Sequence, residues 1–187
     1  MSKPLSYHFR GTTGERKFKD ENDQYEFEDD IIKERVQGLD LTEHLVKHKS
    51  DLSLKKIIKK IKDNTATKEE YQKYDRIKRL SDKRKEAVKA FWEMESERIK
   101  NHQRTTRHWT AEQRAEILKG GRPKVNGKTM QGHHTYSVSK YPQLAGYHNV
   151  IFPVTFEEHL YDWHGGNFHN SLPGRPFKRK RVRRNKK

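Results

Sequence analysis

The sequence contains no cysteine, so a disulfide framework and any metal site built on thiolates are excluded. Apolar residues are scarce as well: 30% of the 187 residues are hydrophobic, whereas 36% are charged. The core must therefore be small, with much of the chain at the surface. No apolar run approaches the ~18 residues of a membrane-spanning helix, and none follows the first N-terminal charges as in a secretory signal peptide.

Positive charge dominates. The chain has 42 Lys and Arg against 26 Asp and Glu, a formal net charge of +16, so the expected partner is a polyanion or an acidic protein. Residues 20–30 are mostly acidic and residues 177–187 mostly basic. Such blocks are usually solvated tails or faces. The alternative is that the basic tail grips phosphates while the acidic segment folds against basic surface or repels nucleic acid from the wrong face.

The middle of the chain is predicted to be helical. Residues 51–63 place isoleucines at helical spacing opposite lysines. A capping box at 67–70 opens a long amphipathic pattern that runs to Ile99, and its aromatic residues are expected to be core. A second capping box at 110–113 opens a helix that should stop at Gly120-Gly121.

From Arg122 onward the pattern changes. Asn126-Gly127 is typical of a tight hairpin turn, and a histidine pair follows at 133–134. A loop then leads to a short apolar strand, 149–153, that is expected to begin at asparagine. The capping box 155–158 predicts a helix beginning at Phe156, carrying a histidine and ending at two glycines, 165–166.

This order suits phosphodiester hydrolysis, which needs a general base and a divalent cation. Neighbouring residues of an extended segment point to opposite faces, so one ring of the pair can meet a metal while the other faces the attacking water. A helix packed across the hairpin would bring His159, and also His164, to that metal. The non-catalytic alternative is that these histidines are hydrogen-bonded structural residues.

The motifs Gly132-His133-His134, Asn149 and 158–167 (EHLYDWHGGN) resemble the HNH/endonuclease VII superfamily, in the variant with a Gly-His-His signature found in nuclease toxins. Residues 106–134 and 141–174 also resemble the C-terminal toxin domains of LXG-type polymorphic toxins, exported by the type VII system of Gram-positive bacteria. Residues 7–44 are similar to the segment that precedes the nuclease in those toxins.

The resemblance implies a ββα-metal site with assigned roles. His133 would bind the metal, His134 would be the general base, and Asn149 would fix the loop and orient that base. His159 would be a helical ligand and His164 a second one, although positions five apart lie about 140° apart around a regular helix. Either the helix unwinds before Gly165 or one of the two is not a ligand, in which case Asn167 or His169 could substitute.

The expected function is a metal-dependent, largely sequence-non-specific endonuclease, acting on DNA in preference to RNA and serving as an antibacterial toxin. Histidine ligation suits Zn²⁺ or Ni²⁺ for binding, and the resemblance implies Mg²⁺ or Mn²⁺ for turnover. The resemblance also implies an acidic immunity protein, export within a larger toxin and action in the cytoplasm of a target bacterium. Basic residues expected to contact phosphates are Arg122, Lys124, Lys128, Arg179 and Arg181.

Three alternatives remain open: an RNase toxin of the same fold, a phage HNH endonuclease, and a non-catalytic basic nucleic-acid-binding protein. The predicted fold is α+β, with a helical N-terminal region packed on a small ββα-metal nuclease core and a disordered basic tail. The predicted divisions are a lead-in at 1–44, a helical region at 45–119, the nuclease core at 120–176 and the tail at 177–187.

Overall fold

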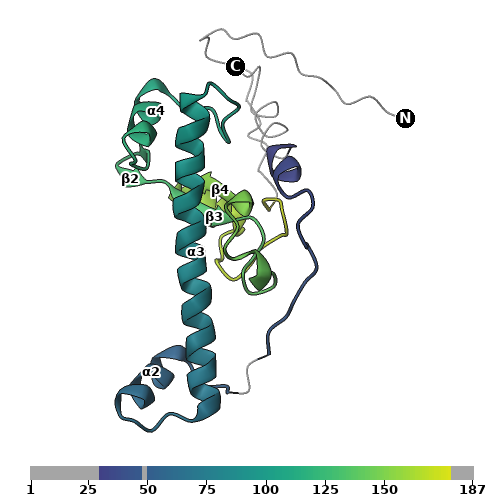
Figure 1. Cartoon of the computed structure of the whole chain (residues 1–187), viewed down its shortest axis with the longest axis vertical. Helices are drawn as coiled ribbons and strands as arrows, with labels where there is room; N and C mark the ends of the chain where they lie inside the picture. Colours follow the sequence, from purple (N-terminus) through teal and green to yellow (C-terminus); the bar gives the residue numbers. More distant parts are fainter. Residues whose placement is uncertain (1–29, 48–49, 178–187) are drawn as a thin grey trace, which may run out of the picture.

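The computed structural model describes residues 30–47 and 50–177 and confirms an α+β architecture (Figure 1). A short helical stretch, 30–35, precedes the named elements. The helices are α2 (Leu54–Lys62), α3 (Lys68–Lys100) and α4 (Ala111–Leu118). Two small antiparallel sheets pair β1 (Lys124–Val125) with β2 (Lys128–Thr129), and β3 (Gln131–His134) with β4 (Ile151–Val154). The short helices are η1 (Pro142–Leu144), η2 (His148–Val150) and η3 (Glu158–Trp163).

Helix α3 is the longest element of the described chain. Both hydrogen bonds of the predicted capping box are present, since Glu70 N donates to Thr67 Oγ1 and Thr67 N donates to the Glu70 carboxylate. With 33 residues the helix is about 50 Å long. Its C-terminal half carries the buried residues Phe91 and Trp92, whereas Tyr71 at its start is 56% exposed. The expectation that the aromatic residues of this pattern are core is therefore wrong for Tyr71, in the first turn of the helix.

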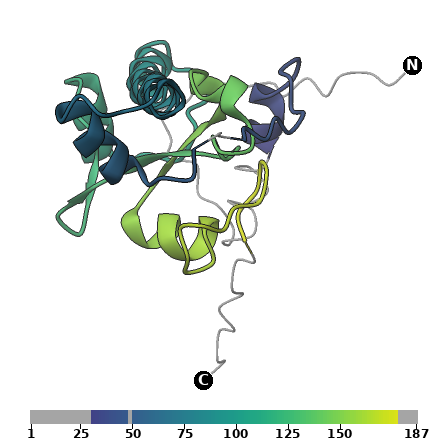
Figure 2. The same cartoon turned by 90° about the horizontal axis from the view of Figure 1, so that it is seen from below.

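The main core lies where α3 crosses the β3–β4 sheet. Figure 2 shows α3 on one side of this sheet and η3 on the other. Two buried clusters fill these two sides. The first joins residues of α3, α4 and β4 to the segments around them: Val36, Ala87, Phe91, Trp92, Ile99, Trp109, Ile117, Met130, Tyr141, Leu144, Val150 and Ile151. The second lies under η3 and contains Ile32, Phe152, Val154 and Trp163.

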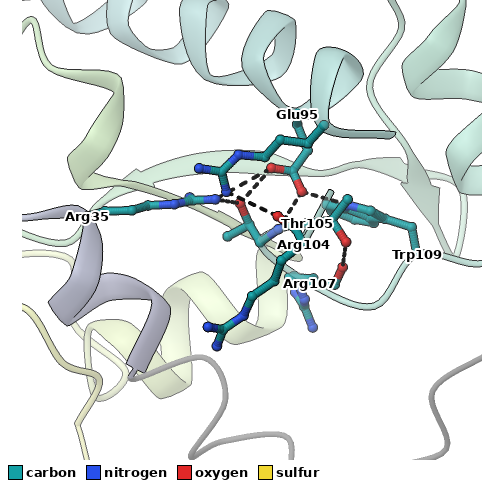
Figure 3. A network of polar contacts seen from close by, with 8 residues as sticks. Arg35, Glu95, Arg104, Thr105, Arg107 and Trp109 are labelled. Atoms are coloured by element: carbon teal, nitrogen blue, oxygen red, sulfur yellow. Dashed lines mark hydrogen bonds and ion pairs between the residues drawn. The ribbon is translucent and has the colours of Figure 1, made fainter. Parts of the chain in front are cut away.

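A buried carboxylate fastens the connector before α4 to α3 (Figure 3). Glu95 is fully buried, and its two oxygens accept hydrogen bonds from Thr106 N, Thr106 Oγ1 and Trp109 Nε1. The Arg35 guanidinium lies 3.8 Å from the same carboxylate and also donates to Thr106 Oγ1. Burial lowers the pKa of Arg35 to about 10, which still leaves it charged at neutral pH. The network therefore joins three segments that are far apart in sequence.

Most local predictions are confirmed. The helices begin at the predicted caps, and the hairpin turn uses Asn126 and Gly127 with positive φ angles of 51° and 75°. One boundary was wrong: the strand begins at Ile151, because Asn149 lies in the 3₁₀ turn η2 that precedes it. Arg179 and Arg181 lie outside the described residues. None of the helices in the described part of the chain has the length and apolar character that a membrane span requires.

Candidate metal centre

The two adjacent histidines of β3 point to opposite sides of the β3–β4 sheet. His133 pairs with Phe152 across the sheet, and His134 pairs with Ile151. The His133 ring lies 4.6 Å from the ring of Trp163 in η3, whereas His134 Nε2 lies 3.1 Å from the Ala145 carbonyl in the loop on the other side. Both side chains are buried, with 5% and 7% exposure. Strand alternation thus separates the two rings, as the sequence predicted.

Three histidines meet on the η3 side. One nitrogen from each of His133, His159 and His164 lies within 4.8 Å of the other two. Two nitrogens that hold one ion at about 2.1 Å are separated by at most about 4.2 Å, so a small side-chain movement would close the set. In residues 30–47 and 50–177 this is the one cluster of three such groups that could hold a metal.

The helix that carries His159 and His164 explains how residues five apart can share an ion. After two residues of ordinary helix, 156–157, the chain continues as a π-helix over Glu158–Trp163. A π-helix repeats its hydrogen bonds every five residues, so positions i and i+5 come to lie on the same side, and such segments are frequent at functional sites. The helix is wider than an α-helix, and it ends at Trp163 with His164 as its C-cap.

The outer nitrogens of the two helical histidines are already bonded. His159 Nδ1 donates to Gln131 Oε1 at 2.5 Å, and His164 Nδ1 donates to the Asn170 carbonyl. A donating Nδ1–H leaves Nε2 unprotonated in the neutral ring, which is the form that binds a metal. Sequence reasoning missed Gln131 and Asn170. Gln131 precedes His133 by two on the same strand face, and that spacing could have identified it.

The electrostatic setting also favours neutral rings. Burial, followed by the neighbouring His159 and His164, lowers the pKa of His133 well below its ordinary value. Burial, His164 and Arg84 lower the pKa of His159 to about 4. These imidazoles therefore stay unprotonated at neutral pH. The donor set fits a borderline cation such as Zn²⁺ or Ni²⁺, with positions left for water or substrate.

His134 has the properties of a proton acceptor. Its Nε2–H donates to the Ala145 carbonyl, which leaves the lone pair on Nδ1. Burial lowers its pKa to about 4, with a further contribution from Arg84, so the ring is neutral near pH 7. A bound phosphodiester would raise this pKa again through its negative charge.

Asn149 contacts a segment outside the three-histidine cluster. Its amide nitrogen donates to the Arg35 carbonyl at 3.1 Å, joining η2 to the end of the 30–35 helix. Its neighbour His148 is partly exposed in the same turn and takes no part in the three-histidine cluster. The loop is held to the sheet by Thr135, whose N and Oγ1 both donate to the Val150 carbonyl.

The start of the helix that carries His159 is held by an ion pair. Arg107 donates from both terminal nitrogens to the two oxygens of Glu158, each at 2.7 Å, and also to the Pro153 carbonyl at 3.1 Å. Glu158 accepts from Thr155 N as well, completing the predicted capping box. Arg107 therefore fixes the residue next to His159. No local sequence pattern predicts this contact, because the two partners lie 51 positions apart.

Arg84 of α3 is a further residue that sequence reasoning missed. Gly132 lies against Val88, so close that a Cβ added to the glycine would stand 2.9 Å from both Val88 methyl carbons. Arg84 is one helical turn before Val88 on the same face. Burial is the main cause of the lowered pKa of His133, His134 and His159, and the positive charge of Arg84 adds to it.

The predicted phosphate contacts near the hairpin are exposed. Arg122 precedes β1, and Lys124 is the first residue of that strand. Lys128 pairs with Glu157 at 3.0 Å and lies over the ring of Phe156, beside the first turn of the metal-binding helix. Asn167 and His169 lie beyond that helix; the Asn167 side chain accepts from His169 N, and neither residue joins the three-histidine cluster.

A comparison with protein families matches residues 74–155 to the family described as GHH signature containing HNH/Endo VII superfamily nuclease toxin. The matched segment includes the Gly132-His133-His134 motif and Asn149, and ends before the helix with His159. A comparison with curated proteins finds no match. HNH/Endo VII nucleases typically depend on a metal, and the three histidines could bind one. Residues 74–155 thus match the model of the GHH-signature nuclease toxins of the HNH/Endo VII superfamily.

Proposed function

We propose that this nuclease toxin is a metal-dependent endonuclease that cuts DNA with little sequence preference and uses His134 as its general base. The observation that carries the proposal is that two adjacent histidines of β3 point to opposite sides of the sheet. His133 turns to the cluster with His159 and His164, and His134 turns to the other side with a free Nδ1. Metal ligation and proton transfer are thereby assigned to adjacent residues.

In this proposal His133, His159 and His164 hold a divalent cation, which when bound neutralises charge on the phosphate and on the leaving oxygen. Gln131 and Asn170 keep the two helical ligands in the required tautomer. His134 Nδ1 takes the proton from the attacking water, while its Nε2–H stays on the Ala145 carbonyl. Asn149 holds the loop that carries this turn through its bond to Arg35.

Arg84 and the exposed basic residues supply backbone contacts. Arg84 lies near the histidines and would pair with the scissile phosphate through its planar donors. Arg122, Lys124, Lys128, Arg179 and Arg181 would contact flanking phosphates. Such contacts carry no base information, which supports a largely non-specific nuclease whose activity falls steeply with salt.

We further propose that the domain acts at the effector end of a larger LXG-type toxin exported by a type VII system and delivered into the cytoplasm of a target bacterium. Its positive charge of +16 favours a cognate immunity protein that is acidic and covers the active surface. RNase activity on the same site is the second candidate, because the three-histidine cluster activates a phosphodiester without regard to the sugar.

The test digests plasmid DNA and total RNA in parallel with Mg²⁺, Mn²⁺ or EDTA, using the wild type and His134→Gln. DNA nicking that requires metal and drops by at least about 100-fold in the variant is expected for loss of a general base. Manganese or zinc titration of the same variant checks that its three-histidine cluster still binds metal.

His44→Ala is the matched control, because His44 is exposed and its ring bonds to Asp40. It should cut DNA at the wild-type rate. If RNA alone is cut, the RNase reading replaces the DNase reading. Metal-independent cutting, or none by any form of the protein, would reject the proposed function.

A further inference from the structure

Helix α2 and the first half of α3 form an arm beyond the nuclease core. We define the basic arm as residues 54–85. In Figure 1, α2 lies against the end of α3 that is far from the β3–β4 sheet. The family match begins at residue 74, so α2 and the first turns of α3 stand outside it. Residues 54–73 of the arm therefore lie outside the part of the chain that matches the family.

The arm is a built structure. Ile57 of α2 is fully buried, and Lys60 pairs with Glu70 of α3 at 2.5 Å. Lys73 Nζ donates to the carbonyls of Ser50 and Leu52, at 2.8 and 2.9 Å, and so fixes the chain that enters α2. These contacts hold α2 at a defined position on α3.

The charges that remain on the arm are almost all positive. Helix α2 has five lysines and no acidic residue. In the described part of the chain Lys55, Lys56, Lys59 and Lys62 are exposed and form no ion pair. By contrast, Asp75 pairs with Arg79 at 2.7 Å and Asp82 with Lys85 at 3.3 Å, both within the arm. The acidic groups are thus largely neutralised internally while the α2 lysines face solvent.

The arm leads to the metal centre. Along α3, exposed Lys83 lies against Gly146, next to the carbonyl that His134 bonds, and Arg84 lies one turn before Val88, which packs on Gly132. From Arg84 back to Lys68 is sixteen residues, about 24 Å of helix. This length spans about 7 base pairs at ~3.4 Å each.

We propose that the basic arm binds the phosphate backbone of duplex DNA at a distance from the cut, holding the substrate while the histidine centre acts. The inference rests on the proposed nuclease function. It adds that substrate length and salt dependence are set by α2, a surface outside the family match. An extended row of lysines on a rigid support suits a regular line of phosphates.

The test compares the wild type with a variant in which Lys55, Lys56, Lys59 and Lys62 are all changed to Gln. Binding of labelled duplexes of about 10 and about 30 base pairs is measured in EDTA over a range of salt concentrations. Each phosphate contact contributes about 0.9 to the slope of log K against log salt, so the slope for the long duplex should become shallower by about 2 to 4. For the short duplex the salt slope should change by less, because about 34 Å of DNA presents fewer phosphates to the arm and the centre together.

The control removes the same charge elsewhere, by Lys33→Gln, Lys89→Gln, Lys100→Gln and Lys119→Gln, at exposed lysines outside the basic arm. Lys60 and Lys73 are kept in both variants, so α2 stays docked, and urea unfolding checks this. Equal losses of DNA affinity in the two variants, or unchanged DNA affinity in the arm variant, would overturn the proposed role of the arm. Cleavage by the wild type would still support the proposed nuclease function. The proposal would also be overturned if the arm variant kept its affinity for DNA and lost only its affinity for an acidic protein.

Discussion

At the scale of single residues, the glycine of the Gly-His-His motif has a packing role. Gly132 pairs with Pro153 in the sheet, and its φ angle is not positive. What requires glycine is the approach of α3: an added Cβ would meet two Val88 methyl carbons at 2.9 Å and one of Ile151 at 3.0 Å. Neither neighbour can withdraw freely, since Ile151 is buried in the sheet. The glycine thus allows α3, with Arg84, to lie directly over the histidine strand.

Gly132→Ala should therefore destabilise the protein by about 1–3 kcal/mol, the usual cost of overpacking. The free energy of unfolding is measured in urea. Val88→Ala in the same chain makes room for the added methyl group and should recover part of the loss, although Val88→Ala alone is destabilising. If the two changes simply add, the contact between residues 88 and 132 is not the reason for glycine.

The buried histidines also predict how the metal-free protein responds to pH. His134 and His159 have pKa values lowered to about 4, whereas an unfolded histidine titrates at about 6.5. Between these values the unfolded chain binds more protons, so the free energy of unfolding should fall as the pH drops from about 6.5 toward about 4. Above pH 6.5 this contribution is fully present.

Urea unfolding in EDTA at several pH values measures this trend. His134→Gln removes one titrating ring, and its stability should fall less steeply with acid than that of the wild type. A wild-type profile that is flat over this range would show that the histidines titrate normally and are open to water.

At the scale of elements, the carboxylate of Glu95 is the main link between α3, the connector and the 30–35 helix. Glu95→Ala would leave Thr106 N and Trp109 Nε1 without acceptors and the Arg35 charge buried without its partner. Removing one member of such a network costs about 3–5 kcal/mol. Urea unfolding measures it. Glu97→Ala, two residues along the same helix, is the control: Glu97 is 61% exposed and its loss should cost under about 0.5 kcal/mol.

The clamp on the metal-binding helix makes a second prediction at this scale. Arg107→Lys keeps the charge and loses the two-pronged bond to Glu158, so His159 should be held less firmly. Affinity for Zn²⁺ should fall by about 10-fold, the lower range for groups that orient a ligand. Calorimetric titration measures this affinity. Arg79→Lys, on an exposed pair with Asp75, should bind Zn²⁺ like the wild type.

The same helix shows where sequence reasoning ends. Capping boxes and the Asn-Gly turn depend on residues within four positions of each other, and they predicted the starts of α3, α4 and the helix at Phe156. The π-helix could not be predicted, because no local pattern distinguishes it from an ordinary helix. The spacing of His159 and His164 raised the question, and the wider turn answers it. Contacts between residues far apart in the sequence, such as Arg107 with Glu158, become visible only in the folded structure.

At the scale of the whole molecule, the stable unit is larger than the segment that matches the family. Residues 74–155 contain the histidine pair, yet two of the three clustered histidines follow them and a share of the core precedes them. Val36 belongs to the main buried cluster, and Ile32 packs with Trp163 beneath the metal centre. The Arg35 side chain forms an ion pair with Glu95, and the Arg35 carbonyl accepts a hydrogen bond from the Asn149 side chain. The 30–37 segment thus supports the centre from outside the motif.

A chain beginning at residue 38 should therefore be less stable than one beginning at residue 30. The shorter chain loses the Arg35 partner of a buried carboxylate together with apolar contacts of Ile32 and Val36, a combined cost above about 3 kcal/mol. The chain from residue 30 keeps every one of these contacts. Urea unfolding and Zn²⁺ titration of both forms make the comparison. Equal stability and equal metal binding would show that residues 30–37 rest on the fold without supporting it, and that the Asn149 loop is held by the sheet alone.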